Sequence, residues 1–412
     1  MKEPPISYKK LPNGVRLVHL RDRSPVAYCG FVVNVGTRDE LPEESGMAHF
    51  VEHLLFKGTR KRRAWHILNR VESVGGELNA YTTKEETFVY ATVLTTHFER
   101  AMELCADVVF HSTFPQKEMD KEVDVIIDEI QSYKDSPSEL IYDDFENMIF
   151  SGSPMGRYIL GDKKALKHYV SEDVRRFVDR TYSADRILFF SIGNIDFKRI
   201  ERWAEKYFMD VPVLASNVSR SALPLYVPQQ KLIRKNTCQS HVMIGTRAFD
   251  LNDDRRLAFG LVNNILGGTG MNSRLNLLLR ERNGMAYNVE SVFTPYSDTG
   301  IFSVYFGTDE KNREKCTALV MGELKRMYTE LIPPHKLLQL KRQWLGQLAI
   351  AQENRENLVL SLARSYLYFD KFESLELVKS QLEKISSEML IDVSETLLHE
   401  DLLSVLVYSD KV

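Results

Sequence analysis

One pattern occurs twice in this 412-residue sequence, once in each half. Residues 35–59 and residues 244–269 both contain the end of an apolar run, Gly-Thr-Arg, an acidic stretch, an apolar helical segment and Gly-Thr. A repeated supersecondary unit predicts two homologous domains of ordinary size. We place the first domain at residues 1–209 and the second at residues 229–412.

The stretch between the two halves, residues 210–228, contains several prolines and is interpreted as an interdomain linker. Within each half, short strand patterns cluster with long helical patterns and show little β-α-β alternation. This order predicts an α+β fold, in which each domain is a mainly antiparallel sheet with helices packed on one face. In the first half we predict strands at residues 26–35, 88–94 and 187–192, and helices at residues 65–74, 98–110, 117–134 and 199–207.

The helical segment of the first copy contains the pentad His49-Phe50-Val51-Glu52-His53. Two histidines four residues apart lie one turn apart on the same face of a helix, where both imidazoles can bind one Zn²⁺. Glu52 would lie beside the open side of the metal, where it can take a proton from water. The alternative is a chance pattern, with two core histidines hydrogen-bonded to backbone carbonyls.

The second copy has lost these polar residues. With one residue inserted, Phe259, Val262 and Asn263 fall opposite His49, Glu52 and His53, respectively. The duplicated helix is therefore expected to pack without the three polar side chains. Packing alone does not explain their presence in the first copy, and this contrast favours a metal site.

A catalytic zinc needs a third protein ligand and one open position. The predicted helix at residues 117–134 carries Glu122 and Glu129 on one stripe, and isoleucines flank Glu129. We therefore predict Glu129 as the third ligand and Glu122 as a hydrogen-bond partner of a ligand histidine. The alternative is a solvated acidic helix face. The matching helix of the second half has Gln347 or Leu348 opposite Glu129, as expected for a metal-free copy.

Composition restricts the partners and the compartment. The chain has 43% apolar and 27% charged residues and a net charge of −3, so neither nucleic acid nor an anionic membrane is expected as a partner. No apolar run is long enough for a membrane span, and the N-terminus lacks a signal-peptide core. The four cysteines show no C-x-x-C spacing and are interpreted as buried thiols of a cytoplasmic protein.

The basic run at residues 60–63 is interpreted as a solvated loop, with a peptide or phosphate contact as the minor alternative.

Residues 46–59 closely resemble the zinc helix of the inverzincin peptidases, the family of pitrilysin, insulin-degrading enzyme and mitochondrial processing peptidase. The resemblance covers nearly the whole chain and is closest to short, two-domain bacterial members related to the processing peptidase β subunit. In this family the third zinc ligand is a glutamate about 76 positions beyond the second histidine, which corresponds to Glu129. A family glutamate seven residues earlier corresponds to Glu122.

The resemblance also implies a set of substrate-binding residues. Asn79, Ala80 and Tyr81 match the strand that holds the substrate backbone, and Arg280 and Tyr287 match a pair that faces the zinc from the other half of the chamber. Tyr287 would also donate a hydrogen bond to the oxyanion. Without the resemblance, Arg280 and Tyr287 would be interpreted as a surface salt bridge and a core tyrosine.

These features predict a zinc-dependent endopeptidase with one Zn²⁺ per chain that cleaves peptides or unfolded polypeptide segments. Relatives with four domains close around the substrate, so a two-domain chain is expected to form a homodimer in which each chamber combines two protomers. The alternative function is a non-catalytic partner or scaffold subunit, as in some family members, although these typically lose pentad residues. A metal-binding regulator is a third option, but a structural site needs no base such as Glu52 and would be closed by a fourth ligand.

Overall fold

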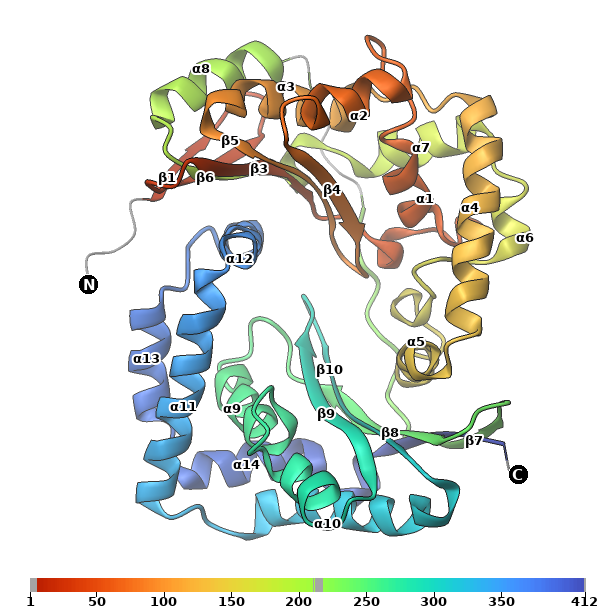
Figure 1. The fold of residues 1–412 in the computed structure, drawn as a ribbon, viewed down its shortest axis with the longest axis vertical. Coiled ribbons are helices and arrows are strands. Elements are labelled where there is room, and N and C mark those ends of the chain that lie inside the picture. Colours follow the sequence, from red (N-terminus) through yellow and green to blue (C-terminus); the bar gives the residue numbers. More distant parts are fainter. Residues whose placement is uncertain (1–5, 210, 212–217, 411–412) are drawn as a thin grey trace. The chain divides into compact units, whose positions relative to one another are not determined.

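The computed structural model describes residues 6–209, 211 and 218–410, which form two compact units (Figure 1). The first unit consists of the residues up to 130, residues 157–222 and residues 351–373. The second unit consists of residues 131–156, residues 223–350 and the residues from 374 onward. Each unit is built on one sheet, and the architecture is the predicted α+β arrangement.

The first sheet has six strands in the order β1-β2-β6-β3-β5-β4. They are β1 (Ile6–Lys10), β2 (Arg16–Arg21), β3 (Val26–Val33), β4 (Glu77–Thr82), β5 (Thr87–Leu94) and β6 (Ile187–Gly193). Strands β2 and β6 are parallel, and every other neighbouring pair is antiparallel. Strand β4 pairs only with β5 and forms one edge of this sheet.

The second sheet has five strands in the order β7-β11-β8-β10-β9. They are β7 (Gln230–Arg234), β8 (Ser240–Ala248), β9 (Ala286–Pro295), β10 (Gly300–Thr308) and β11 (Ser404–Ser409). Strands β7 and β11 are parallel and the other pairs antiparallel, so this sheet repeats the arrangement β2-β6-β3-β5-β4 strand by strand. The duplication read from the sequence is therefore confirmed in the topology of the two sheets.

The helices follow the same repeat. The first unit contains α1 (Met47–Leu54), α2 (Ala64–Glu72), α3 (Phe98–His111), most of α4 (Gln116–Lys134), α6 (Lys163–Leu166), α7 (Ser171–Thr181), α8 (Phe197–Tyr207) and α12 (Arg355–Phe369). The second unit contains α5 (Pro137–Ile149), α9 (Arg256–Gly267), α10 (Arg313–Thr329), most of α11 (Pro334–Glu353), α13 (Leu375–Lys384) and α14 (Ser387–Leu398). The helices and strands predicted for the first half agree with these bounds to within two residues. No helix in the described ranges combines the length and the apolar character that a bilayer crossing requires.

Two helices lie outside the domain ranges expected from the sequence. Helix α5 belongs to the second unit although it precedes the linker, and α12 belongs to the first unit although it follows the linker. The chain passes from the first unit to the second between Ala222 and Leu223, inside the predicted linker at residues 210–228. Compared with the domains that we predicted, residues 1–209 and 229–412, the two compact units have exchanged one helix each. Helix α5 has moved to the second unit and α12 to the first.

Apolar contacts explain why α12 lies on the first sheet. Residues Val359 and Leu362 of α12 are fully buried against Val32 and Phe190, on the sheet face opposite the one that packs on α3 (Figure 1). Helices therefore cover both faces of the sheet, rather than the single face that we predicted. The reason is visible in β6, whose residues are all buried and nearly all apolar, because a strand without polar alternation needs cover on both sides.

Helix α5 has the corresponding place in the second unit. Its residues Ile141 and Phe145 are fully buried in one cluster with Met243 and Tyr305, whereas Val242 and Ile244 of β8 point into a separate cluster that includes α9. Each sheet is thus completed by a helix from the other half of the sequence.

Candidate metal centre

Helix α1 is fixed at its first turn by the residues that precede it. Gly46 has a φ of +82°, and a Cβ atom there would lie 2.8 Å from the Cα of Gly161, so the position requires glycine. The carboxylate of Glu40, which is buried, accepts hydrogen bonds from the backbone N–H groups of Gly46 (3.1 Å) and Ala48 (2.9 Å). These bonds satisfy two donors that the start of a helix leaves unpaired. The orientation of α1 is therefore well defined.

Three potential metal ligands lie close together. They are His49 on the first turn of α1, His53 on its last turn and Glu129 on α4. Nε2 of His49 lies 3.8 Å from Oε2 of Glu129, and Nε2 of His53 lies 3.7 Å from the same oxygen. The ligand atoms of all three residues lie within 4.8 Å of one another. Ligands of a tetrahedral zinc at about 2.0–2.2 Å are about 3.3–3.6 Å apart, so the three atoms would draw together, by about 1.5 Å at most for any pair, around a bound ion. Two imidazoles and one carboxylate are also a donor set that zinc accepts.

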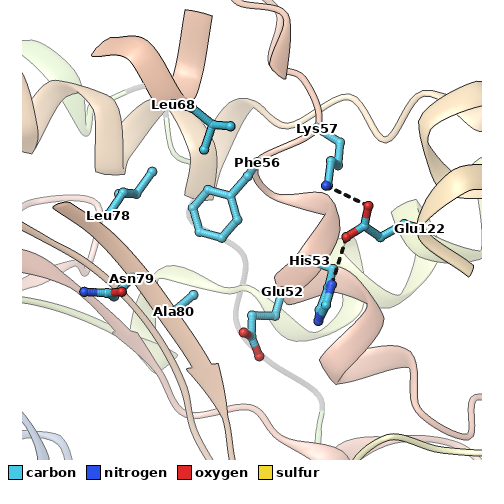
Figure 2. Close-up of a pocket in the computed structure, with 9 residues that line it drawn as sticks. All are labelled: Glu52, His53, Phe56, Lys57, Leu68, Leu78, Asn79, Ala80 and Glu122. Carbon is cyan, nitrogen blue, oxygen red and sulfur yellow. Dashed lines mark hydrogen bonds and ion pairs between the residues drawn. The ribbon is translucent and has the colours of Figure 1, made fainter. Parts of the chain in front are cut away.

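The remaining ring nitrogen of His53 is held by Glu122. Nδ1 of His53 lies 2.9 Å from Oε1 of Glu122, and Nζ of Lys57 lies 2.6 Å from Oε2 (Figure 2). Burial raises the pKa of Glu122, but the hydrogen bonds from His53 and Lys57 outweigh it and hold the pKa below its usual value. An ionised Glu122 can only accept, so Nδ1 carries the proton and Nε2 keeps its lone pair for a metal.

The surroundings of His49 keep its imidazole neutral. Burial, assisted by the neighbouring His53, lowers the pKa of His49 to about 3, so its imidazole is neutral at physiological pH. Its Nδ1 atom is buried and has no hydrogen-bond partner among the described residues. The two histidines therefore differ, because only His53 has a carboxylate that orients it.

Glu52 has a carboxylate oxygen that the protein itself does not satisfy. Its Oε2 atom is buried, and no hydrogen-bond partner for it occurs within the described ranges. Burial raises the pKa of Glu52 above that of an ordinary glutamate. A carboxylate with a raised pKa and a free oxygen, one residue before a potential ligand, has the properties of a general base for a water molecule.

A cavity of about 290 Å³ opens beside Glu52 and His53. Figure 2 shows Phe56, Leu68, Leu78 and Ala80 on one side of it and the two polar residues on the other. The sequence did not single out Phe56, Lys57, Leu68 or Leu78 as lining residues. The first two lie three and four residues after the pentad. The alternation along β4 could have placed Leu78 on its inner face, whereas Leu68 is exposed on α2 and had no such signal.

Strand β4 positions the predicted backbone-binding segment. Asn79 and Ala80 line the cavity, and the outer edge of β4 has no strand partner among the described residues. Tyr81 lies on the strand face opposite Ala80, because its ring stacks on Phe88 at 4.8 Å in the cluster that packs under α12. The side chain of Tyr81 therefore points away from the cavity, as alternation along a strand requires, and only its backbone lies on the edge.

Arg280 and Tyr287 belong to the second unit, not to the unit that holds the histidines. Arg280 lies in a π-helical turn (Asn276–Glu281) and Tyr287 in β9, and the guanidinium carbon lies 5.7 Å from the centre of the tyrosine ring. Tyr287 is 83% exposed, so it is not a core tyrosine. The structure brings these two residues together and leaves the tyrosine hydroxyl accessible.

The second copy keeps the helix without the metal-binding set. Phe259 and Val262, which replace His49 and Glu52, are fully buried in the core of the second unit. His49, His53 and Glu129 form the one convergent group of potential metal ligands found in the described part of the chain. The second copy therefore fills these two positions with buried apolar side chains in place of polar ones.

Comparison with known families finds two profiles that match consecutive parts of the chain. The profile described as insulinase (peptidase family M16) matches residues 16–163, and the profile described as peptidase M16 inactive domain matches residues 169–344. Two solved structures share the fold. A peptidase M16 inactive domain from Pseudomonas fluorescens has a TM-score of 0.91 and 20% identity and covers 99% of this chain and 98% of its own. A protease from Helicobacter pylori has a TM-score of 0.87 and 19% identity and covers 98% of this chain and 100% of its own.

The similar sequences include proteins named as zinc proteases. An uncharacterised zinc protease of Bacillus subtilis is 30% identical over 94% of this chain and 95% of its own length. The mitochondrial-processing peptidase subunit beta of Saccharomyces cerevisiae is 28% identical over 93% of this chain and 86% of its own length. Since these matches span nearly the whole chain and the family profiles cover both repeats, the protein is a member of peptidase family M16.

Proposed function

We propose that the protein is a zinc-dependent endopeptidase that holds one Zn²⁺ at His49, His53 and Glu129. The observation that carries the proposal is the convergence of these three ligand atoms next to a buried, unpartnered oxygen of Glu52. The names of the relatives support it, because they are zinc proteases or subunits of a processing peptidase.

The chemistry follows from the side chains at the site. A zinc ion bound there would polarise a peptide carbonyl and make a water molecule more acidic. Glu52 accepts the proton of the attacking water at Oε2 and later delivers it to the leaving amine. The chain of contacts from Lys57 through Glu122 to His53 keeps the imidazole in the tautomer and orientation that the reaction needs.

The substrate class follows from β4 and the cavity. An extended peptide can add to the free edge of β4 at Asn79–Tyr81, where main-chain hydrogen bonds give affinity with little demand on sequence. The apolar wall formed by Phe56, Leu68 and Leu78 suits an apolar side chain beside the cleaved bond. The substrate is therefore a peptide or an unfolded polypeptide segment.

The alternative, a non-catalytic partner subunit, has weaker support. The profile of the inactive domain matches only residues from 169 onward, whereas the pentad lies in the part matched by the insulinase profile.

We also propose a cytoplasmic location, because Cys29, Cys105 and Cys316 are buried free thiols. Cys238, however, is exposed, contrary to our expectation of four buried thiols.

Incubation with a mixed peptide pool tests the peptidase function. The zinc-loaded protein should produce internal cleavage products, a chelator should abolish them, and added Zn²⁺ should restore them, all followed by mass spectrometry. A protein with bound zinc that yields no products would instead support the partner-subunit function. Products that are unchanged in the presence of chelator would exclude a metallopeptidase.

We further propose that the active form is a homodimer. Arg280 and the exposed Tyr287 lie in the other repeat from the proposed zinc ligands. The family resemblance implies that groups at these positions face the zinc across a chamber. A two-domain chain reproduces such a chamber most simply as a C₂ dimer. Zinc would then come from one protomer, and Arg280 and Tyr287 from its partner, with Tyr287 donating a hydrogen bond to the oxyanion.

Subunit complementation tests this assembly. A His49→Ala protein and an Arg280→Ala, Tyr287→Ala protein should each be nearly inactive. After random subunit exchange, half of the dimers are mixed and each has one intact chamber, so activity should return to about a quarter of the wild-type value. Light scattering that gives the mass of a single chain for a fully active sample would exclude the shared site.

A further inference from the structure

A second cavity of the first unit is strongly basic. It has a volume of about 400 Å³ and lies between the start of α2 and α3, where Lys61, Arg62, Arg70 and Arg100 contribute to its lining. The chain as a whole has a net charge of −3, so this concentration of positive charge is local. The zinc-site chemistry described above does not use the cavity, which contains part of the basic run at residues 60–63.

Two carboxylates on α3 fix part of this positive charge in place. Arg62 bonds to Asp107 through Nη1 (2.5 Å) and to Glu103 through Nη2 (2.8 Å), and Arg70 reaches Glu103 at 3.4 Å. Thr59 donates a further hydrogen bond to the buried carboxylate of Asp107 (2.8 Å). These contacts hold the Arg62 guanidinium rigidly, which lowers the entropy that a bound anion would have to overcome.

The charge that remains is not neutralised by the protein. Of the four basic side chains, only Arg62 and Arg70 contact the two carboxylates on α3. Neither Lys61 nor Arg100 forms an ion pair with a described residue. The other lining residues, His66, Asn69 and Ser73, are uncharged or weakly basic and can all donate hydrogen bonds. The lining thus offers many donors and no negative charge.

The volume and the donors define the ligand. About 300–1,000 Å³ is the usual size of a small-molecule site, so the cavity exceeds the needs of one simple ion. Arginine presents a planar fork that matches phosphate oxygens, and Lys61 adds a mobile point charge. We propose that this cavity binds a small anion that carries two or more phosphate groups, either a free polyphosphate or a nucleoside polyphosphate.

Isothermal titration calorimetry of the full-length protein tests the proposal with pyrophosphate, tripolyphosphate, ATP, adenosine and sulfate as probes. Pyrophosphate and tripolyphosphate should bind more tightly than sulfate, and their affinity should fall as salt is raised. Tighter binding of ATP than of tripolyphosphate would identify a nucleoside polyphosphate, and equal binding a free polyphosphate. Binding to the metal-depleted protein should be unchanged, because the site does not include the zinc ligands.

Two substitutions locate the site. Arg100→Gln and the exposed Lys61→Gln should each weaken pyrophosphate binding roughly tenfold, because each removes a charged donor. Arg63→Gln is the matched control, since Arg63 belongs to the same basic run but does not line the cavity, and its affinity should stay within about twofold. Thermal unfolding without ligand checks that the variants are folded. The proposal is wrong if no phosphate probe binds more tightly than sulfate, or if both cavity variants bind pyrophosphate like the wild type.

Discussion

Replacing Glu52 with glutamine should reduce peptide hydrolysis by about two to four orders of magnitude without loss of bound zinc. Glutamine has nearly the same shape but cannot accept the proton of the attacking water at the atom that Glu52 leaves unpaired in its buried position. Neither ligand histidine depends on Glu52, because Glu122 orients His53 and the fold holds His49. Initial rates on a fluorogenic peptide, together with elemental analysis of zinc, measure the two effects separately.

The exposed Glu43, in the acidic stretch before the same helix, provides the control for this experiment. Glu43→Gln makes the same chemical change outside the cavity and should retain the wild-type rate. If Glu52→Gln also cleaves at the wild-type rate, Glu52 is not the base and the proposed mechanism fails.

Replacing Glu129 should reduce zinc affinity by more than about 100-fold, a larger loss than is typical of residues that only support a ligand. The carboxylate of Glu129 is the one group that reaches toward both histidines, with distances of 3.8 Å and 3.7 Å. Without it, two neutral imidazoles would have to hold a divalent cation alone. Competition with a chelator that reports free zinc measures the affinity of each variant.

Two neighbours on α4 complete this series. Glu122→Ala should weaken zinc binding by about 10–100-fold, because it frees the ring of His53 and leaves Lys57 without its partner. Asp128→Asn should have no effect, since Asp128 is exposed on another face of the helix. Equal zinc retention in the Glu129 and Asp128 variants would remove Glu129 from the site.

Much of the metal centre could be predicted from sequence because it depends on helical periodicity. The spacing of His49 and His53 puts both on one face of α1, and the isoleucines beside Glu129 turn that residue inward on α4. The prediction that Glu122 bonds a ligand histidine came from the stripe that it shares with Glu129, and the family resemblance supported it. Periodicity does not say which histidine is bonded, and the structure shows that it is His53, at 2.9 Å.

The features that escaped prediction depend on long-range packing. The basic run at residues 60–63 is largely exposed, as interpreted from the sequence, but the bonds of Arg62 to Glu103 and Asp107 were not predicted, because these carboxylates come more than 40 residues later. The outward turn of the Tyr81 side chain needed the strand register, which places it opposite Phe88. The exchange of α5 and α12 could not be read from the duplicated pattern, because a repeat predicts the helices but not the sheet on which each one packs.

The exchanged helices make the two repeats dependent on each other for folding and, in evolution, for being retained in the sequence. Val359, Leu362 and Tyr366 of α12 seal an apolar sheet face that a chain ending at the linker would expose to water and to aggregation. Deletion of the second half of the sequence would therefore strip a layer from the unit that carries the histidines. This dependence gives a physical reason why the second repeat is retained although it has no catalytic residues. The second repeat folds without them, but the first repeat cannot bury its sheet without a helix from the second.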